Sequence, residues 1–138
     1  MYKTRILMVK EESTDFKPCQ FTTPESVYEA FKHLSKASQE EMHIIALNAK
    51  NMMIDSYMVS RGSLTASIVH PREVFKFLFL QNAASFIMVH NHPSGDISVS
   101  QEDYEITNRL TDCGFLLGIK LLDHIIIGKN QFKSLLYF

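Results

Sequence analysis

The sequence has few of the features that mark secreted, membrane-spanning or nucleic-acid-binding proteins. Its 138 residues include only two cysteines, which fit no disulfide framework and are typical of a reduced intracellular protein. No apolar run approaches the ~20 residues of a membrane helix, and the N-terminus has no signal-peptide pattern. The formal net charge is −1 with scattered Lys and Arg, so no basic stripe predicts nucleic-acid binding. We therefore expect a cytoplasmic protein that is not bound to a membrane.

The composition is that of an ordinary globular protein. Hydrophobic residues make up 46% of the chain and charged residues 21%, a balance that favours one domain with a substantial core. The sequence contains no internal repeat, low-complexity tract or linker. We expect residues 1–21 to form an N-terminal strand and connection, and residues 22–138 to form the domain itself.

Hydrophobic periodicity predicts alternating strands and helices. The predicted strands cover residues 4–10, 42–48, 52–59, 86–90, 124–127 and 132–136, with a further extended stretch at 64–69. The predicted helices begin after Thr23, at Pro71 and at Ser100, and the third of them stops near Cys113-Gly114. This order predicts an α/β domain with a mixed sheet and helices packed on it.

The most informative stretch begins where the predicted central strand ends. His90 and His92 are two residues apart, a spacing that places both imidazoles on one face of a strand. Asp103 follows at the start of the next predicted helix, after a turn that contains Pro93 and Gly95. Two histidines and one carboxylate, with a fourth position left for water, are typical of a catalytic zinc site.

A purely structural interpretation of the same residues stands beside this one. Histidines at a strand end often pack in a core, and Ser100-x-x-Asp103 has the pattern of a helix capping box. The two interpretations of Asp103 are compatible, because a carboxylate in the first helical turn can cap the helix and still bind a cation. Two imidazoles and a carboxylate also suit iron or manganese.

A hydrolytic zinc site needs a base for its water. Glu40 and Glu41 precede the predicted strand 42–48 and are the candidates. Acidic residues also commonly precede strands as solvated side chains. Alternation along the strand directs one of the two toward the site, and the pattern alone does not say which.

These residues carry a resemblance to a known family. His90-x-His92 with Ser100-x-x-Asp103 resembles the JAMM signature of MPN-type zinc isopeptidases, and more closely the JAB domain of the bacterial RadC family. Further similar stretches are Gly62-Ser63-Leu64, His70–Phe75, Asn82–Ala84, Glu105–Thr107 and Gly118–His124. The resemblance runs from about residue 22 to the C-terminus. Only about 20 residues precede it, so we expect a stand-alone JAB domain without the helix-hairpin-helix region usual in RadC proteins.

The resemblance implies a three-layer, cytidine-deaminase-like α/β fold with a mixed β-sheet flanked by helices. It implies Zn²⁺ held by His90, His92 and Asp103, and Ser100 as the hydroxyl that stabilises the tetrahedral oxyanion. It favours Glu40 as the general acid/base, with Glu41 in reserve. The implied activity is a zinc metallopeptidase that cleaves peptide or isopeptide bonds in a peptide or protein substrate.

Other functions compete with this hypothesis. The chain can instead be a non-catalytic protein-binding module, or a DNA-repair-associated factor that retains the zinc site. A nucleobase deaminase shares the fold but uses H-x-E with P-C-x-x-C, and this sequence has no C-x-x-C. A homodimer is compatible with the sequence, which does not fix the substrate or the oligomeric state.

Overall fold

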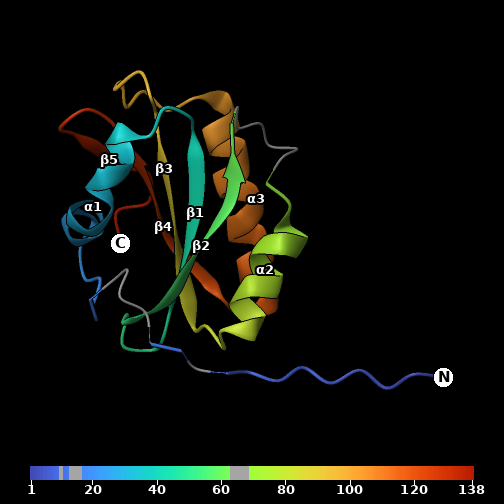
Figure 1. Ribbon diagram of the computed structural model, residues 1–138. Helices are drawn as coiled ribbons and strands as arrows, with labels where there is room; N and C mark the ends of the chain where they lie inside the picture. Colours follow the sequence, from blue (N-terminus) through green and yellow to red (C-terminus); the bar gives the residue numbers. More distant parts are fainter. Residues whose placement is uncertain (10, 13–16, 63–68) are drawn as a thin grey trace.

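The structure is a computed structural model, and it describes residues 1–9, 11–12, 17–62 and 69–138 (Figure 1). The helices of this described part are α1 (Pro24–Phe31), the short 3₁₀ helix η1 (Lys32–Lys36), α2 (Pro71–Leu80) and α3 (Gln101–Leu117). The strands are β1 (Glu41–Leu47), β2 (Met53–Arg61), β3 (Ser85–Asn91), β4 (Lys120–Ile127) and β5 (Phe132–Ser134).

The five strands form one mixed sheet in the order β2-β1-β3-β4-β5. β3 and β4 are parallel, with α3 as the connection between them, and the other neighbouring strands are antiparallel. Met42 of β1 lies opposite His90 of β3, so the beginning of β1 meets the end of β3 at the same end of the sheet. β3 is the central strand, between β1 and β4, and all seven of its residues are buried.

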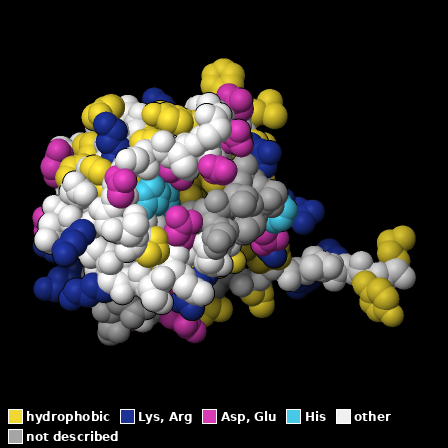
Figure 2. Space-filling model, turned by 90° about the horizontal axis from the view of Figure 1, so that it is seen from above, with side chains coloured by type: hydrophobic (Ala, Val, Ile, Leu, Met, Phe, Trp, Pro, Cys, Tyr) yellow, Lys and Arg dark blue, Asp and Glu magenta, His cyan; other side chains and the backbone are white. Residues whose placement is uncertain are grey.

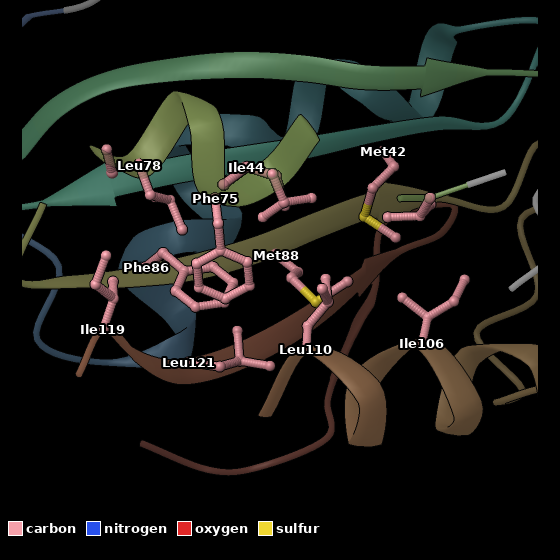
Figure 3. Packing of buried hydrophobic residues seen from close by; sticks show 13 residues of the cluster. Met42, Ile44, Phe75, Leu78, Phe86, Met88, Ile106, Leu110, Ile119 and Leu121 are labelled. Carbon is pink, nitrogen blue, oxygen red and sulfur yellow. The ribbon is translucent and has the colours of Figure 1, made fainter. Parts of the chain in front are cut away.

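Helices cover both faces of the sheet and produce three layers, with α1 on one side and α2 and α3 on the other (Figure 1). Figure 3 shows the core on the α2–α3 side, where Phe75 of α2 and Leu110 of α3 meet Phe86 and Met88 of β3. The opposite core is built by α1 residues such as Val27 and Phe31 against the alternate residues of the same strands. This arrangement confirms the predicted α/β class with a mixed sheet flanked by helices.

Local sequence explains where the helices begin. Thr23 caps α1: its hydroxyl accepts from the Ser26 backbone N–H, and its own N–H is bound by the Ser26 hydroxyl. Ser100 caps α3 in a second capping box, completed by Asp103. Pro24 and Pro71 stand at the first helical positions, where a missing N–H costs nothing.

Two predicted boundaries of the third helix and the following strand are wrong. α3 does not stop at Cys113-Gly114 but continues to Leu117, and ends at Gly118 with φ of 74°. Gly114 lies inside the helix, where only glycine fits, because the Ile119 carbonyl passes so close that it leaves no room for a Cβ atom. β4 then begins at Lys120, four residues before its predicted start.

The N-terminal strand predicted for residues 4–10 is also wrong for residues 4–9, while residue 10 lies outside the described residues. Ile6, Leu7, Met8 and Val9 are all exposed. Apolar, β-prone residues make a strand only where a neighbouring strand and a packed face receive them, and here the local preference is not supported by such contacts.

Most of the extended stretch predicted at 64–69 lies outside the described residues, which exclude 63–68. Val69 is described, and its side chain is buried in the α2–α3 core. Among the described helices, none is long and apolar enough to cross a membrane.

Candidate metal centre

Three predicted ligands meet beyond the C-terminal end of the central strand β3. His90 is the penultimate residue of β3, His92 follows the strand directly, and Asp103 stands in the first turn of α3. The His92 backbone N–H donates to the Ile127 carbonyl of β4 at 2.9 Å, which extends the parallel pairing beyond the end of β3. Both histidines are therefore placed by the sheet, and Asp103 is placed by the helix that begins beside them.

The ligand atoms of the three side chains converge on one point. His90 Nε2 lies 3.0 Å from His92 Nε2 and 3.2 Å from Asp103 Oδ1. His92 Nε2 lies 3.5 Å from Asp103 Oδ2. His90 and Asp103 are buried, and His92 is partly buried at the pocket wall. The predicted ligand set is thus brought together as a group that can hold one metal ion.

Neighbouring groups orient these ligands. His92 Nδ1 lies 2.7 Å from the Asp96 carbonyl oxygen, which can only accept, so the proton of a neutral His92 is on Nδ1 and its Nε2 presents a lone pair. Asp103 Oδ2 accepts from the Ser100 backbone N–H at 2.8 Å, and this bond fixes the carboxylate in the capping box. Metal ligands are commonly oriented by such outer hydrogen bonds.

The charges of the group favour a cation. Burial raises the pKa of the Asp103 carboxyl, but hydrogen bonds with His90 and His92 outweigh burial and hold that pKa well below its ordinary value. The hydrogen bond to Asp103 in turn raises the pKa of His92, against the effect of its burial. Asp103 therefore stays ionised, and the site stabilises positive charge next to it.

The donor set fits a metal of the zinc type. A lone pair of His92 Nε2 and an ionised carboxylate face the same point as His90 Nε2, and mutual repulsion of such acceptors is relieved by a cation between them. Two imidazoles and one carboxylate leave one position open in a four-coordinate site, as in catalytic zinc centres. The capping interpretation of Asp103 is confirmed, because its side chain accepts from the Ser100 backbone N–H.

A polar pocket of about 340 Å³ opens onto this group. Its lining residues are Glu40, His92, Pro93, Ser94, Asp96, Ser98, Ser100 and Asp103. Figure 2 shows this end of the molecule, where a histidine and several acidic side chains gather at the surface. The pocket joins the metal-ligand group to both residues that were predicted to take part in catalysis.

Glu40 and Glu41 differ sharply in their surroundings. Glu40 lines the pocket and lies close enough to His92 to raise its pKa. The Glu41 carboxylate instead pairs with Arg61 of the neighbouring β2 at 3.0 Å and contacts His43 of its own strand at 3.1 Å. Of the two candidates, the structure brings Glu40 to the pocket.

Ser100 also lies on the pocket wall, at the N-terminus of α3. Its oxygen accepts from the Asp103 backbone N–H at 3.1 Å, and its own backbone N–H donates to the Asp103 carboxylate. Neither bond uses the hydroxyl hydrogen of Ser100. The side chain can therefore cap the helix and donate to an oxygen in the pocket at the same time.

Sequence reasoning missed two residues that support the site. The Asn91 side chain accepts from the Glu41 backbone N–H at 2.7 Å and donates to the Gln39 carbonyl at 2.9 Å, so it clamps the segment that carries Glu40. Thr107 bonds to the backbone carbonyl of Asp103 one helical turn back. Thr107 could have been found from its i, i+4 spacing to Asp103, whereas Asn91 gives no signal beyond its place between the histidines.

Known proteins resemble this chain over most of its length. The family model described as RadC-like JAB domain matches residues 21–137. A UPF0758 protein of Bacillus velezensis is 58% identical over 98 residues, UPF0758 protein YsxA of Bacillus subtilis is 57% identical, and a UPF0758 protein of Staphylococcus aureus is 55% identical. These matches cover 71% of this chain but only 42–45% of each relative, so the chain spans less than half the length of the relatives it matches.

Proposed function

Because the chain belongs to the RadC-like JAB domain family, we propose that it is a zinc-dependent hydrolase that cleaves peptide or isopeptide bonds. The observation that carries the proposal is the convergence of His90, His92 and Asp103 on one point at the wall of a polar pocket. Two further residues of that pocket, Glu40 and Ser100, have side chains suited to acid–base and oxyanion chemistry.

In this proposal, His90, His92 and Asp103 hold the ion. Zinc bound by such ligands supplies Lewis acidity, which lowers the pKa of water and polarises a carbonyl group. The geometry alone is sufficient for these residues to form a group able to hold a metal. The assignment to zinc rests on the two imidazoles, the single carboxylate and the open fourth position.

Glu40 is the general base and then the general acid. Its carboxylate takes a proton from the attacking water as the water oxygen bonds to the carbonyl carbon. It passes that proton to the departing nitrogen as the C–N bond breaks, so that a carboxylic acid and an amine are released. The proposal is supported by the position of Glu40 in the pocket and by the engagement of Glu41 with Arg61.

Ser100 stabilises the oxyanion. The hydroxyl hydrogen that the helix cap leaves unused donates to the carbonyl oxygen as negative charge develops there. The N-terminus of α3 lies beside the same pocket, and its dipole also favours negative charge. Both effects are greatest in the transition state, which is the condition for raising the rate.

The proposal is tested by metal content and hydrolysis together. Mass spectrometry of protein purified without added metal is expected to find about one zinc per chain, lost in His92→Ala. A proteome-derived peptide mixture and a peptide acylated on a lysine ε-amine are the substrate probes, and Glu40→Gln is the matched inactive control. Zinc binding without cleavage of either probe would instead support a non-catalytic binding module. A chain that takes up no zinc would remove the basis of the proposal.

A further inference from the structure

A chain of hydrogen bonds runs behind the metal-ligand group, through residues that the proposed chemistry does not use. The Thr107 hydroxyl donates to the Asp103 backbone carbonyl at 2.6 Å, and its oxygen lies 2.6 Å from His124 Nδ1. His124 Nε2 lies 2.7 Å from His90 Nδ1. His90 and His124 have no exposed surface, and Thr107 is 3% exposed. The chain is therefore sealed from water.

The direction of every bond in this chain follows from its first member. The Asp103 carbonyl can only accept, and Thr107 has one hydroxyl hydrogen to give. The Thr107 oxygen must then accept from an N–H at Nδ1 of His124. A neutral imidazole carries one N–H, and full burial favours the neutral form of His124.

His90 comes at the end of this chain and is oriented by it. Because His124 has its proton on Nδ1, its Nε2 accepts, and the partner at 2.7 Å must be an N–H at Nδ1 of His90. The Nε2 atom of His90 then has a lone pair, and it is this atom that faces His92 and Asp103. The backbone carbonyl of Asp96 does the same for His92 in a single step.

We propose that Thr107 and His124 are positioning residues that hold His90 in the tautomer able to bind a metal through Nε2. This inference rests on the metal site of the proposed function. His124 belongs to β4 and Thr107 to the second turn of α3, so the hydrogen-bond chain joins the central strand β3 to both α3 and β4. It also links the two buried ligands, because it begins at the backbone of Asp103 and ends at the ring of His90.

The first test measures the tautomers directly, in metal-free wild-type protein at an alkaline pH where imidazoles are neutral. Nitrogen-15 NMR of labelled histidines distinguishes a proton on Nδ1 from one on Nε2. We expect His124 and His90 both to carry the proton on Nδ1. A proton on Nε2 of His124 would reverse the chain and overturn the inference, without any change to the fold or to the metal ligands.

The second test uses a matched pair of variants. Thr107→Val keeps the shape of the side chain but removes both hydrogen bonds, whereas Thr107→Ser keeps the hydroxyl. Zinc affinity measured by chelator competition is expected to fall about 10- to 100-fold in Thr107→Val, the usual effect of losing an outer-shell partner, and to stay close to wild type in Thr107→Ser. A third variant, His124→Gln, offers an amide oxygen to His90 and is expected to bind zinc more tightly than His124→Leu.

The outcomes separate this inference from the proposed function. Equal zinc affinity in Thr107→Val and Thr107→Ser, with tight binding in wild type, would overturn the positioning role and leave the metal site standing. Absence of zinc binding in wild type would overturn the proposed function, and the tautomer measurement would still decide the direction of the hydrogen-bond chain. The unfolding free energy of each variant shows whether a change in affinity reflects a loss of structure.

Discussion

Glu41 and Arg61 lie opposite each other on β1 and β2, and their side chains form an ion pair with Oε1 and Nη2 3.0 Å apart. The other carboxylate oxygen of Glu41 contacts His43 Nε2 at 3.1 Å. Burial raises the pKa of Glu41, but these two partners outweigh it and the net pKa is lowered. Of the two adjacent acids, Glu41 is thus held by contacts within the sheet, whereas Glu40 borders the pocket.

The first prediction distinguishes these two acids. Glu40→Gln is expected to lower kcat by about 10²- to 10⁴-fold, the usual contribution of a general base, with the zinc content unchanged. Glu41→Gln is expected to keep most of the activity, because its carboxylate faces Arg61. Steady-state kinetics and metal analysis of the two variants measure this. A large loss of activity in Glu41→Gln alone would assign the base to Glu41.

The second prediction concerns pH and stability. The folded-state pKa of Glu41 is below its ordinary value of 4.5, so its ion pair stabilises the fold above that pH. The contribution is lost as pH falls from 4.5 through the folded-state pKa. Glu41→Gln is expected to lower the free energy of unfolding by about 0.5–1 kcal/mol at neutral pH, a small value because Arg61 is largely solvated.

Urea unfolding at neutral pH and well below pH 4.5 measures this difference, which is expected to shrink in acid. Glu29→Gln is the matched control, since its exposed pair with Lys32 is expected to contribute little at any pH. A deficit in Glu41→Gln that persists unchanged in acid would show that the charge of Glu41 is not its cause.

The third prediction separates the two uses of Ser100. Ser100→Ala removes the acceptor of the Asp103 N–H and is expected to cost about 1 kcal/mol of stability. It also removes the oxyanion donor, and a further fall in kcat of about 10²- to 10³-fold is expected. Ser100→Thr keeps both groups and serves as the control. Full activity in a destabilised Ser100→Ala would restrict Ser100 to capping.

The fourth prediction concerns Asn91, whose side chain clamps the backbone on both sides of Glu40. Asn91→Ala removes two partly buried hydrogen bonds, to the Glu41 N–H and the Gln39 carbonyl, so a loss of about 1–3 kcal/mol is expected, together with a lower kcat and unchanged zinc content. Asn48→Ala is the matched control, because Asn48 braces the turn at the other end of β1. It is expected to reduce stability alone. Equal effects on kcat in both variants would reduce the role of Asn91 to general stability.

The fifth prediction tests the close packing inside α3. Helix propensity alone predicts that Gly114→Ala gains about 1 kcal/mol. The structure predicts a loss of about 1–3 kcal/mol, because the new methyl would press on the Ile119 carbonyl and lie 3.4 Å from the Phe86 ring. Denaturant unfolding measures the sign. Asp112→Ala, at an exposed position of the same helix, is expected to change stability by less than about 0.5 kcal/mol.

The residues of the proposed metal site could be predicted from sequence because their geometry is local. His90 and His92 are fixed by strand periodicity, and Asp103 by the capping pattern at the start of α3. Local pattern fails at Gly114, where a glycine that reads as a helix stop is required by a contact with Ile119. It fails again at residues 4–9, whose β propensity meets no partner strand among the residues that the structure describes.

The supporting residues were hidden for a different reason. Asn91 and Thr107 acquire their roles from segments distant in the chain: Asn91 bonds to residues 50 and 52 positions earlier, and Thr107 to His124, 17 positions later. The i, i+4 spacing signals only the bond of Thr107 to Asp103, and no periodicity encodes these longer-range contacts. The choice between Glu40 and Glu41 was open in the sequence for the same reason, since it depends on the pairing of Glu41 with Arg61 across two strands.

The origin of the pocket residues has a consequence for the order of events during folding. His90, His92 and Asp103 all come from the single unit β3–α3, whereas Glu40 reaches them only when β1 pairs with β3. Closing the longer loop is the slower step, because contacts distant in the chain cost more entropy before they form. A partly folded chain can therefore gather the three proposed ligands before Glu40 reaches them, and under the proposed function hydrolysis would require the completed sheet.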